Sequence, residues 1–305
     1  MRLNATINKT ALVTGATGFV GSHIVRRLLT DGWDVHIVAL PVDNYALLQN
    51  ILESITVHTH DGSSGSMQKI IDKARPGIAF HLASIFVAQH EQKDISPLIT
   101  SNVLFGTQVV EALAANGCFR FINTGTSWQH FENRNFSPVN LYAATKQAFE
   151  DILQFYVEAT PMKVVTLKLY DTYGPGDPRP KLFTLLRKTA AEQQALAMSP
   201  GEQLIDLVYI DDVVEAFVQA ARLLLENQVV QNEEYAVSSG DAMPLRQLVE
   251  LYGRVIKKKL PIEWGGRPYR PREVMTPWST GKTLPGWRPK IGLEEGIKRM
   301  ETIPG

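Results

Sequence analysis

The feature that most constrains this chain is a group of three glycines behind a short apolar run. Residues 10–14 read Thr-Ala-Leu-Val-Thr, and Gly15, Gly18 and Gly21 follow at intervals of three. Apolar residues then recur at helical spacing over residues 22–29. This order predicts a strand, a tight glycine turn and a helix.

A glycine turn at the start of a helix is suited to binding a pyrophosphate. Glycine lacks a Cβ, so the backbone approaches the phosphates closely, and the free N–H groups at the helix N-terminus attract negative charge. The usual dinucleotide fingerprint spaces its glycines by two and then three, so an ordinary strand-to-helix turn is the alternative. A second apolar run over residues 34–39 completes a strand-helix-strand unit and favours dinucleotide binding.

The composition excludes several classes of protein. The 305 residues carry 31 basic and 31 acidic side chains, which indicates no surface for nucleic acid or an anionic membrane. The single cysteine, Cys118, excludes an intramolecular disulfide and a cysteine-based metal cluster, and we expect no metal site. We predict a cytoplasmic protein, because no uninterrupted apolar stretch reaches membrane-spanning length and residues 1–4 lack a signal-peptide core.

Strands and helices alternate along the first half of the chain. Apolar runs predict further strands at residues 55–60, 78–84 and 119–124. Helical spacing predicts helices between them, at residues 66–74 and 101–116. Such alternation is typical of an α/β protein with a doubly wound parallel sheet. His81 lies inside an apolar run, which favours a buried core histidine over a ligand.

The end of the second predicted strand bears on the choice of cofactor. Folds of this kind that select NAD tend to place an acidic residue there, where it binds the ribose hydroxyls of the adenosine. Ala39 or Leu40 holds that place, so no carboxylate repels a 2′-phosphate. We therefore favour NADP(H), with NAD(H) as the alternative. The loop holds no strong basic anchor, and His23 and Arg26 are the potential helpers.

Residues suited to proton transfer follow the fifth predicted strand. That strand ends in Thr124-Gly125-Thr126-Ser127, at the carboxyl edge of the sheet where ligands bind. Tyr142 and Lys146 stand four apart in a helix-forming segment and share a helical face. Alone, such a pair is more often a chance surface pair. A nearby ammonium lowers the pKa of a phenol from about 10, which suits proton exchange with a sugar or alcohol oxygen.

The glycine turn, Thr126, Tyr142 and Lys146, in this order and spacing, resemble the extended short-chain dehydrogenase/reductases of the NAD-dependent epimerase/dehydratase family, which act on nucleotide sugars. Later segments are also similar to the family, at residues 168–177, 206–213, 234–240 and 284–289. The resemblance implies a Rossmann dinucleotide-binding domain over residues 1–170, with 204–225 packing back on it. A smaller C-terminal α/β substrate domain would occupy residues 171–305.

The resemblance also implies the site residues. Thr126, Tyr142 and Lys146 would be catalytic. Residues at the glycine turn, at strand ends and beside the catalytic group would bind the cofactor: Gly15, Thr17, Gly18, Phe19, Val20, Gly21, Asp61, Gly62, Leu82, Ala83, Ser84, Thr124, Tyr142 and Lys146. Asp61 has an alternative as the cap of the following helix.

The substrate residues are implied by a need to bind a diphosphate. Those expected are Ser127, Asp171, Arg179, Lys181 and Arg270. Arg270 resembles one diphosphate arginine of the family, while Ile205 replaces another. Arg179 and Lys181 have an alternative as solvated loop charges. Asp171 stands where relatives often have asparagine, so we expect it to contact sugar hydroxyls.

Two departures from the family narrow the reaction. Dehydratases carry Asp-Glu directly after the catalytic threonine, whereas this chain has Ser127-Trp128, which disfavours dehydration. Without an acid at the second strand end, a one-way reductase fits better than an NAD-dependent epimerase. The chain most resembles the 4-ketoreductases of deoxysugar biosynthesis, the branch that includes paratose synthase. The resemblance implies reduction of the C4 keto group of a nucleotide-linked 4-keto-6-deoxyhexose or 3,6-dideoxyhexose.

Three other functions stay open at this point. A nucleotide-sugar 4-epimerase would use the same residues with a tightly kept NAD. A cofactor-sensing regulator would have no need of the proton-transfer pair. A small-molecule ketone or aldehyde reductase would have no need of arginines for a diphosphate. Helices after residues 101 and 141 would pair in a homodimer, as is common in relatives.

Overall fold

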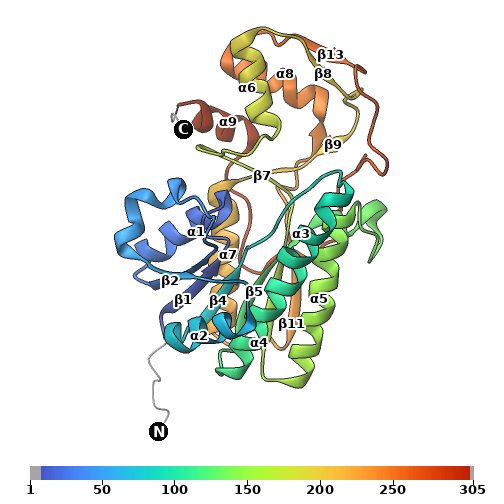
Figure 1. Cartoon of the computed structure of the whole chain (residues 1–305). Coiled ribbons are helices and arrows are strands. Elements are labelled where there is room, and N and C mark those ends of the chain that lie inside the picture. The colour runs from blue at the N-terminus through green and yellow to red at the C-terminus, as the bar shows by residue number, and fades with distance from the viewer. Residues whose placement is uncertain (1–7, 303–305) are drawn as a thin grey trace.

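The computed structural model describes residues 8–302, which form a large α/β unit and a smaller unit beyond the carboxyl ends of its strands (Figure 1). The large unit contains a seven-stranded sheet in the order β11-β6-β5-β4-β1-β2-β3. Its strands are β1 (Thr10–Thr14), β2 (Asp34–Ala39), β3 (Thr56–Thr59), β4 (Ile78–His81), β5 (Arg120–Thr126), β6 (Lys163–Leu169) and β11 (Asn232–Val237). Every neighbouring pair is parallel, which confirms the predicted doubly wound α/β fold.

Helices cover both faces of this sheet. One face carries α1 (Phe19–Thr30) and α7 (Ile210–Leu225), and the other carries α2 (Ser64–Ala74), α4 (Phe105–Ala115) and α5 (Leu141–Ala159). The buried strands supply both cores because successive side chains alternate between faces. In β1, Ala11 and Val13 pack toward α1, while Leu12 packs toward α2 and α4.

The glycine turn lies where the strand order reverses. Chain connections run outward in one direction from β1 to β3 and in the other from β4 to β11. Between β1 and β4 the loops diverge and leave a crevice at the carboxyl ends of the strands. The first two strands have the predicted bounds. The predicted third and fourth strands are shorter in the structure, and β5 continues through Thr126.

The helix predicted to begin at Ser101 begins earlier. A short helix, α3 (Ile95–Ile99), leads through a π-helical turn, η3 (Thr100–Leu104), into α4. The side chains of Glu91 and Asp94 form a capping box just before α3, and Pro97 lies in its first turn, where proline is tolerated. The π-helical turn places one extra residue in the helix directly beside the crevice.

The combined helix Gln92–Ala115 is the one helix within residues 8–302 that is long and apolar enough to cross a membrane. The sequence analysis did not anticipate it, because polar residues interrupt the apolar ones. Val109, Val110 and Leu113 are buried in the core between this helix and the sheet. This half of the helix is therefore a core helix of the α/β unit.

The smaller unit contains three helices and short strand pairs. Its helices are α6 (Leu182–Glu192), α8 (Leu245–Ile256) and α9 (Leu293–Thr302). The pairs are β7 (Asp171–Tyr173) with β10 (Leu207–Tyr209), β8 (Leu196–Met198) with β13 (Ile262–Trp264), and β9 (Leu204–Ile205) with β12 (Met243–Pro244). The boundary at residue 170 stays a prediction. Besides α7, β11 also returns to the large unit, where it forms the edge of the sheet beside β6.

Candidate active site

The glycine turn between β1 and α1 leaves no room for side chains at two positions. Gly15 has a φ of +69°, and a Cβ there would lie 2.5 Å from the backbone nitrogen of Ala83. A Cβ on Gly21 would overlap the carbonyl oxygen of Gly15. Gly18 is the N-cap residue of α1, and it has no side chain to accept a hydrogen bond from the first N–H groups of this helix. The first N–H groups of α1 are thus available to a phosphate, and the turn fits the pyrophosphate of a dinucleotide.

A cavity of about 420 Å³ extends from this turn along the ends of β2 and β3. Predicted cofactor residues that line it are Gly15, Thr17, Gly18, Gly62, Leu82, Ala83 and Ser84. Asp61 is exposed and does not line it, and its carboxylate accepts hydrogen bonds from the backbone N–H and hydroxyl of Ser63, at 2.8 and 2.7 Å. The alternative role of Asp61 as the cap of α2 is wrong, because the side chain of Ser63 caps that helix.

A second cavity, of about 240 Å³, holds all three predicted catalytic residues. Besides Thr126, Tyr142 and Lys146, it is lined by Phe19, Val20, Gly21 and Thr124 of the predicted cofactor set and by Ser127, Asp171, Arg179 and Lys181 of the predicted substrate set. The fold therefore brings residues into one cavity from segments as far apart in the sequence as the glycine turn after β1 and the start of α6. Their individual roles stay predictions.

The start of α5 fixes the position of Tyr142. Asn140 caps this helix, and its side-chain oxygen accepts the N–H of Ala143 at 2.9 Å. The amide of Asn140 also donates to the carbonyl oxygens of Val87 and Ala88, at 3.3 and 3.0 Å. The helix start is thereby tied to the loop after β4. The hydroxyls of Ser84 in that loop and of Thr126 in β5 lie beside the hydroxyl of Tyr142.

Burial determines the protonation of the catalytic pair. It raises the pKa of Tyr142 to about 12, despite the lowering effect of the nearby hydroxyls of Ser84 and Thr126. Burial also lowers the pKa of Lys146 to about 8, which the charge of Glu150 partly offsets. The expectation that Lys146 lowers the pKa of Tyr142 is wrong in this structure, because burial outweighs any such effect. Tyr142 is a neutral phenol at neutral pH and is able to donate a proton.

Asn102 organises the site from the π-helical turn, and the sequence analysis assigned it no role. It is buried, and its side-chain oxygen accepts the hydroxyl of Ser84 at 3.1 Å and the N–H of Ile85 at 2.8 Å. Its amide donates to the carbonyl of Ile85 at 3.0 Å and to the hydroxyl of Thr145 at 2.9 Å. Asn102 therefore holds Ser84 against Tyr142. The signal in the sequence was that Asn102 is an amide residue on the apolar face of a predicted helix.

A buried ion cluster lies beneath Thr126. The ammonium of Lys168 is 2.7 Å from a carboxylate oxygen of Glu150 and 3.0 Å from one of Glu234, and the Lys168 side chain is fully buried. Gly125 provides the space, since a Cβ there would lie 2.6 Å from Cδ of Lys168. Burial raises the pKa of Glu150. No local pattern identifies this cluster, because its members come from three elements.

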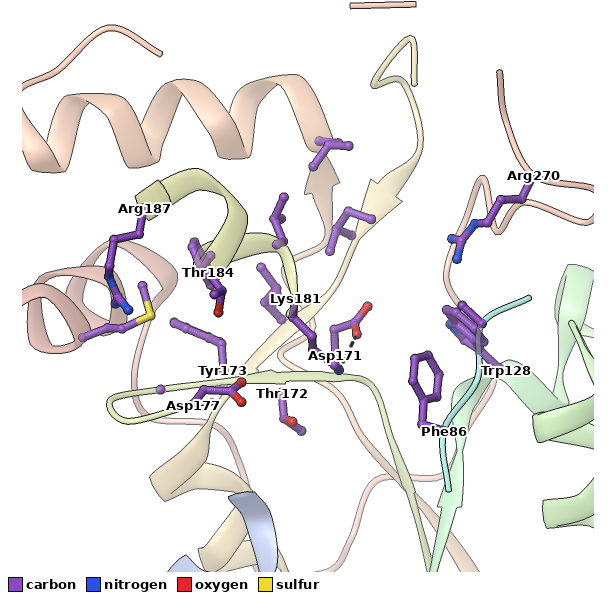
Figure 2. A pocket seen from close by; sticks show the side chains of 18 residues that line it. Phe86, Trp128, Asp171, Thr172, Tyr173, Asp177, Lys181, Thr184, Arg187 and Arg270 are labelled. Carbon is purple, nitrogen blue, oxygen red and sulfur yellow. Dashed lines mark hydrogen bonds and ion pairs between the residues drawn. The ribbon is translucent and has the colours of Figure 1, made fainter. Parts of the chain in front are cut away.

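A third cavity, of about 260 Å³, lies between the two units (Figure 2). Phe86 and Trp128 stand side by side along it, with ring centres 5.6 Å apart, and Phe86 meets the ring of Tyr142 edge-on at 5.0 Å. Lys181 and Asp171 lie in its middle and form an ion pair of 3.1 Å. The guanidinium of Arg270 lies 5.4 Å from the ring centre of Trp128. The cavity combines an aromatic wall beside the phenol with cations further out.

The predicted substrate residues divide between the two cavities. Asp171 and Lys181 line both the catalytic cavity and the cavity between the units. Arg270 lines the cavity between the units, and Ser127 and Arg179 line the catalytic cavity. Arg179 donates to the carboxylate of Asp177 and lies 4.7 Å from the ring centre of Phe19, at the start of α1. Arg187 of α6 also lines the cavity between the units, although the sequence analysis did not select it.

Comparisons with known proteins agree with this geometry. The chain is 28% identical to CDP-abequose synthase of Salmonella typhimurium, with 95% of this chain and 97% of that protein covered. It is 25% identical to CDP-abequose synthase of Salmonella muenchen, with 96% and 97% covered. Among solved structures, UDP-glucuronic acid 4-epimerase from Bacillus cereus, in complex with UDP-glucuronic acid and NAD, matches with a TM-score of 0.84 at 22% identity, covering 96% of this chain and 98% of that chain.

The family itself is shown by a match that includes the glycine turn and the catalytic cavity. Residues 11–237 match the sequence model of the NAD dependent epimerase/dehydratase family. The matched segment starts in β1, includes the glycine turn, Thr126, Tyr142 and Lys146, and ends with β11. It comprises well over half of the 305 residues. This chain belongs to the NAD dependent epimerase/dehydratase family.

Proposed function

We propose that this protein reduces the C4 keto group of a nucleotide-linked 4-keto-6-deoxyhexose or 4-keto-3,6-dideoxyhexose in deoxysugar biosynthesis. Membership of its family makes it an NAD(P)-dependent oxidoreductase of nucleotide sugars. The observation that carries the proposal is the neutral phenol of Tyr142, which faces the cavity of the glycine turn beside the hydroxyls of Ser84 and Thr126. The similarity to two proteins named CDP-abequose synthase supports a reductase of this branch.

The proposed mechanism assigns the proton to Tyr142. The nicotinamide cofactor, when bound, supplies hydride to C4. Tyr142 donates its proton to O4, where negative charge develops, and Thr126 donates a hydrogen bond to the same oxygen. Ser84 holds the phenol in place, since Asn102 fixes its hydroxyl. Lys146, one helical turn along α5, stabilises the resulting phenolate and binds the nicotinamide ribose.

The substrate would lie across the cavity between the units. Lys181 and Arg270 bind the diphosphate, because both cations reach this cavity from loops of the smaller unit. Asp171 contacts sugar hydroxyls. Phe86 and Trp128 cover the apolar face of the sugar next to Tyr142. Trp128 stands where a dehydratase carries glutamate, so the chain lacks a carboxylate to eliminate water at this place.

The main test is an assay of CDP-, dTDP-, GDP- and UDP-linked 4-keto sugars with NADPH and with NADH. We expect oxidation of the reduced cofactor with at least one substrate. Sugar conversion without added reductant by protein that carries bound NAD would instead favour a 4-epimerase. Binding of cofactor with no turnover of any ketone would favour a sensor, and turnover of simple ketones alone would favour a small-molecule reductase.

The role of Tyr142 is tested by Tyr142→Phe. We expect this variant to lose turnover and to keep nearly the same affinity for the cofactor, because the ring remains and only the proton is lost. Tyr156→Phe is the matched control, since Tyr156 lies on the same helix and its hydroxyl donates to Glu111 outside the cavities. Full activity of Tyr142→Phe would contradict the mechanism.

The remaining partners belong to the same proposal. A nucleotide-diphosphate sugar is the partner that the family membership supports. We propose that the protein acts as a homodimer, and the cytoplasmic location stays a prediction. No group of three or more His, Cys, Asp or Glu suited to a metal ion occurs within residues 8–302.

A further inference from the structure

The loop after β2 carries a carboxylate back to the end of that strand. Residues 40–43 form a turn in which the N–H of Asp43 donates to the carbonyl oxygen of Leu40 at 3.1 Å. The N–H of Leu40 in turn donates to Oδ2 of Asp43 at 2.9 Å. Pro41 lies at the second position of this turn, for which its fixed φ is suited. The side chain of Asp43 is thereby held at the position directly after Ala39.

Asp43 lines the 420 Å³ cavity that begins at the glycine turn. Val38, Ala39 and Leu40 at the end of β2, and Thr17 in the glycine turn, line the same cavity. An acidic residue at this place is what binds the adenosine ribose in NAD-selective folds. The sequence analysis looked for it at Ala39 or Leu40. In the structure the acidic residue is Asp43, three residues after Leu40. The turn of residues 40–43 brings its carboxylate back to the end of β2.

No lysine or arginine accompanies Asp43 among the described residues that line this cavity. His60 lines it, but burial lowers the pKa of this histidine, so the ring is neutral at neutral pH. Arg26 donates instead to the carbonyl oxygen of Leu47 at 2.7 Å and to the side chain of Asn50 at 2.6 Å. His23 packs edge-on against Phe19, and burial lowers its pKa as well. Neither potential helper for a 2′-phosphate lines this cavity.

We infer that Asp43 selects the dinucleotide and that this protein prefers NAD(H) to NADP(H). The carboxylate accepts a hydrogen bond from an adenosine ribose hydroxyl. It repels a 2′-phosphate, which would lie beside one anion with no lysine or arginine to compensate. This inference reverses the preference for NADP(H) derived from the sequence, and it withdraws the missing acid at the second strand end as an argument for a reductase over an epimerase. It rests on the dinucleotide binding contained in the proposed function.

The test is the affinity of the purified full-length protein for NAD⁺ and for NADP⁺, measured by isothermal titration calorimetry. We expect the wild type to bind NAD⁺ more tightly by about 10- to 100-fold, the usual range for hydrogen bonds to a charged group. Asp43→Asn keeps an oxygen for the N–H of Leu40 but removes the charge, and should reduce this ratio at least about tenfold. Glu53→Gln is the matched control, because Glu53 is an exposed acid of the following segment outside the cavity.

The outcomes separate the two proposals. Equal or tighter binding of NADP⁺ by the wild type, or an unchanged ratio in Asp43→Asn, overturns the role of Asp43 and leaves the reductase intact. Binding of neither dinucleotide overturns the proposed function together with this inference. A thermal melt of each variant shows whether the turn, rather than the charge, was affected. If Asp43→Asn melts as the wild type does, a loss of selectivity is assigned to the carboxylate.

Discussion

Tyr142, the proposed proton donor, is a phenol with a pKa of about 12, four residues before an amine with a pKa of about 8. Tyr142 thus stays protonated across the neutral and mildly alkaline range. Lys146 is charged below pH 8 and loses its proton above it. A mechanism that needs both the phenol and the ammonium is therefore limited on its alkaline side by Lys146.

This difference predicts the pH dependence of the reduction. We expect kcat to fall as the pH rises through about 8, because the Lys146 ammonium that stabilises the phenolate is lost. This fall is measured from the profile of kcat against pH at saturating substrate. In Lys146→Arg the guanidinium stays charged, so the alkaline limb should disappear from this range even if the rate is lower. An identical limb in that variant would assign the titration to another group.

At this scale the sequence identifies some site residues and misses others for a physical reason. Tyr142 and Lys146 are visible because one helix fixes their spacing. Asn102 and Asp43 act through hydrogen bonds that only the folded chain creates, one in a π-helical turn and one in a loop turn. Arg179, expected at the substrate, lines the catalytic cavity, where its ion pair with Asp177 holds its guanidinium over Phe19 at the start of α1.

At the scale of elements, the turn between β1 and α1 depends on backbone packing. The Cβ of Gly21→Ala would overlap a backbone oxygen that has no room to move, whereas that of Gly18→Ala would lie 3.3 Å from Gly15 O. We expect Gly21→Ala to lose dinucleotide binding and to lower the melting temperature clearly, and Gly18→Ala to melt close to the wild type. Calorimetric titration and thermal melts measure both. Equal melting of the two variants would contradict the packing argument.

The ion cluster beneath Thr126 joins three elements, β6, α5 and β11. Lys168→Met would leave the carboxylate of Glu150 buried without its partner, which typically costs about 3–5 kcal/mol of the free energy of unfolding. The double variant Lys168→Met with Glu150→Gln removes both charges and should recover a large part of that loss. Denaturant unfolding of the two variants measures the difference. A single variant as stable as the wild type would show that the pair contributes nothing.

The predicted elements succeeded where periodicity was local. β1 and β2 have the predicted bounds because apolar residues fill both faces of buried parallel strands. The start of the helix before α4 was missed because a capping box and an early proline determine it, and apolar spacing does not show them. Residues 234–240 were recognised only as similar to the family, because the place of β11 beside β6 depends on contacts across some seventy residues of sequence.

Exposed apolar side chains lie on adjacent helices of the large unit. Ile95 and Ile99 of α3, Leu104 of η3 and Phe155 of α5 are each more than two-fifths exposed. These elements lie side by side (Figure 1). Apolar side chains gathered on adjacent helices are typical of an interface between proteins. The predicted homodimer would bury them through the same helices that carry Tyr142 and Asn102.

The dimer is tested by placing a charge on this surface. Phe155→Asp would put one carboxylate from each chain into the buried centre of a symmetric interface, where it would have no partner. We expect the wild type to have twice the mass of the 34.0 kDa chain in light scattering, and Phe155→Asp to have the mass of one chain. Phe136→Asp is the matched control, because Phe136 is equally exposed, at 58% against 61%, but lies in the loop before α5. A dimer that survives Phe155→Asp but not Phe136→Asp would place the interface elsewhere. Because the π-helical turn belongs to this surface, loss of the dimer should also lower turnover if pairing holds Asn102 against Ser84.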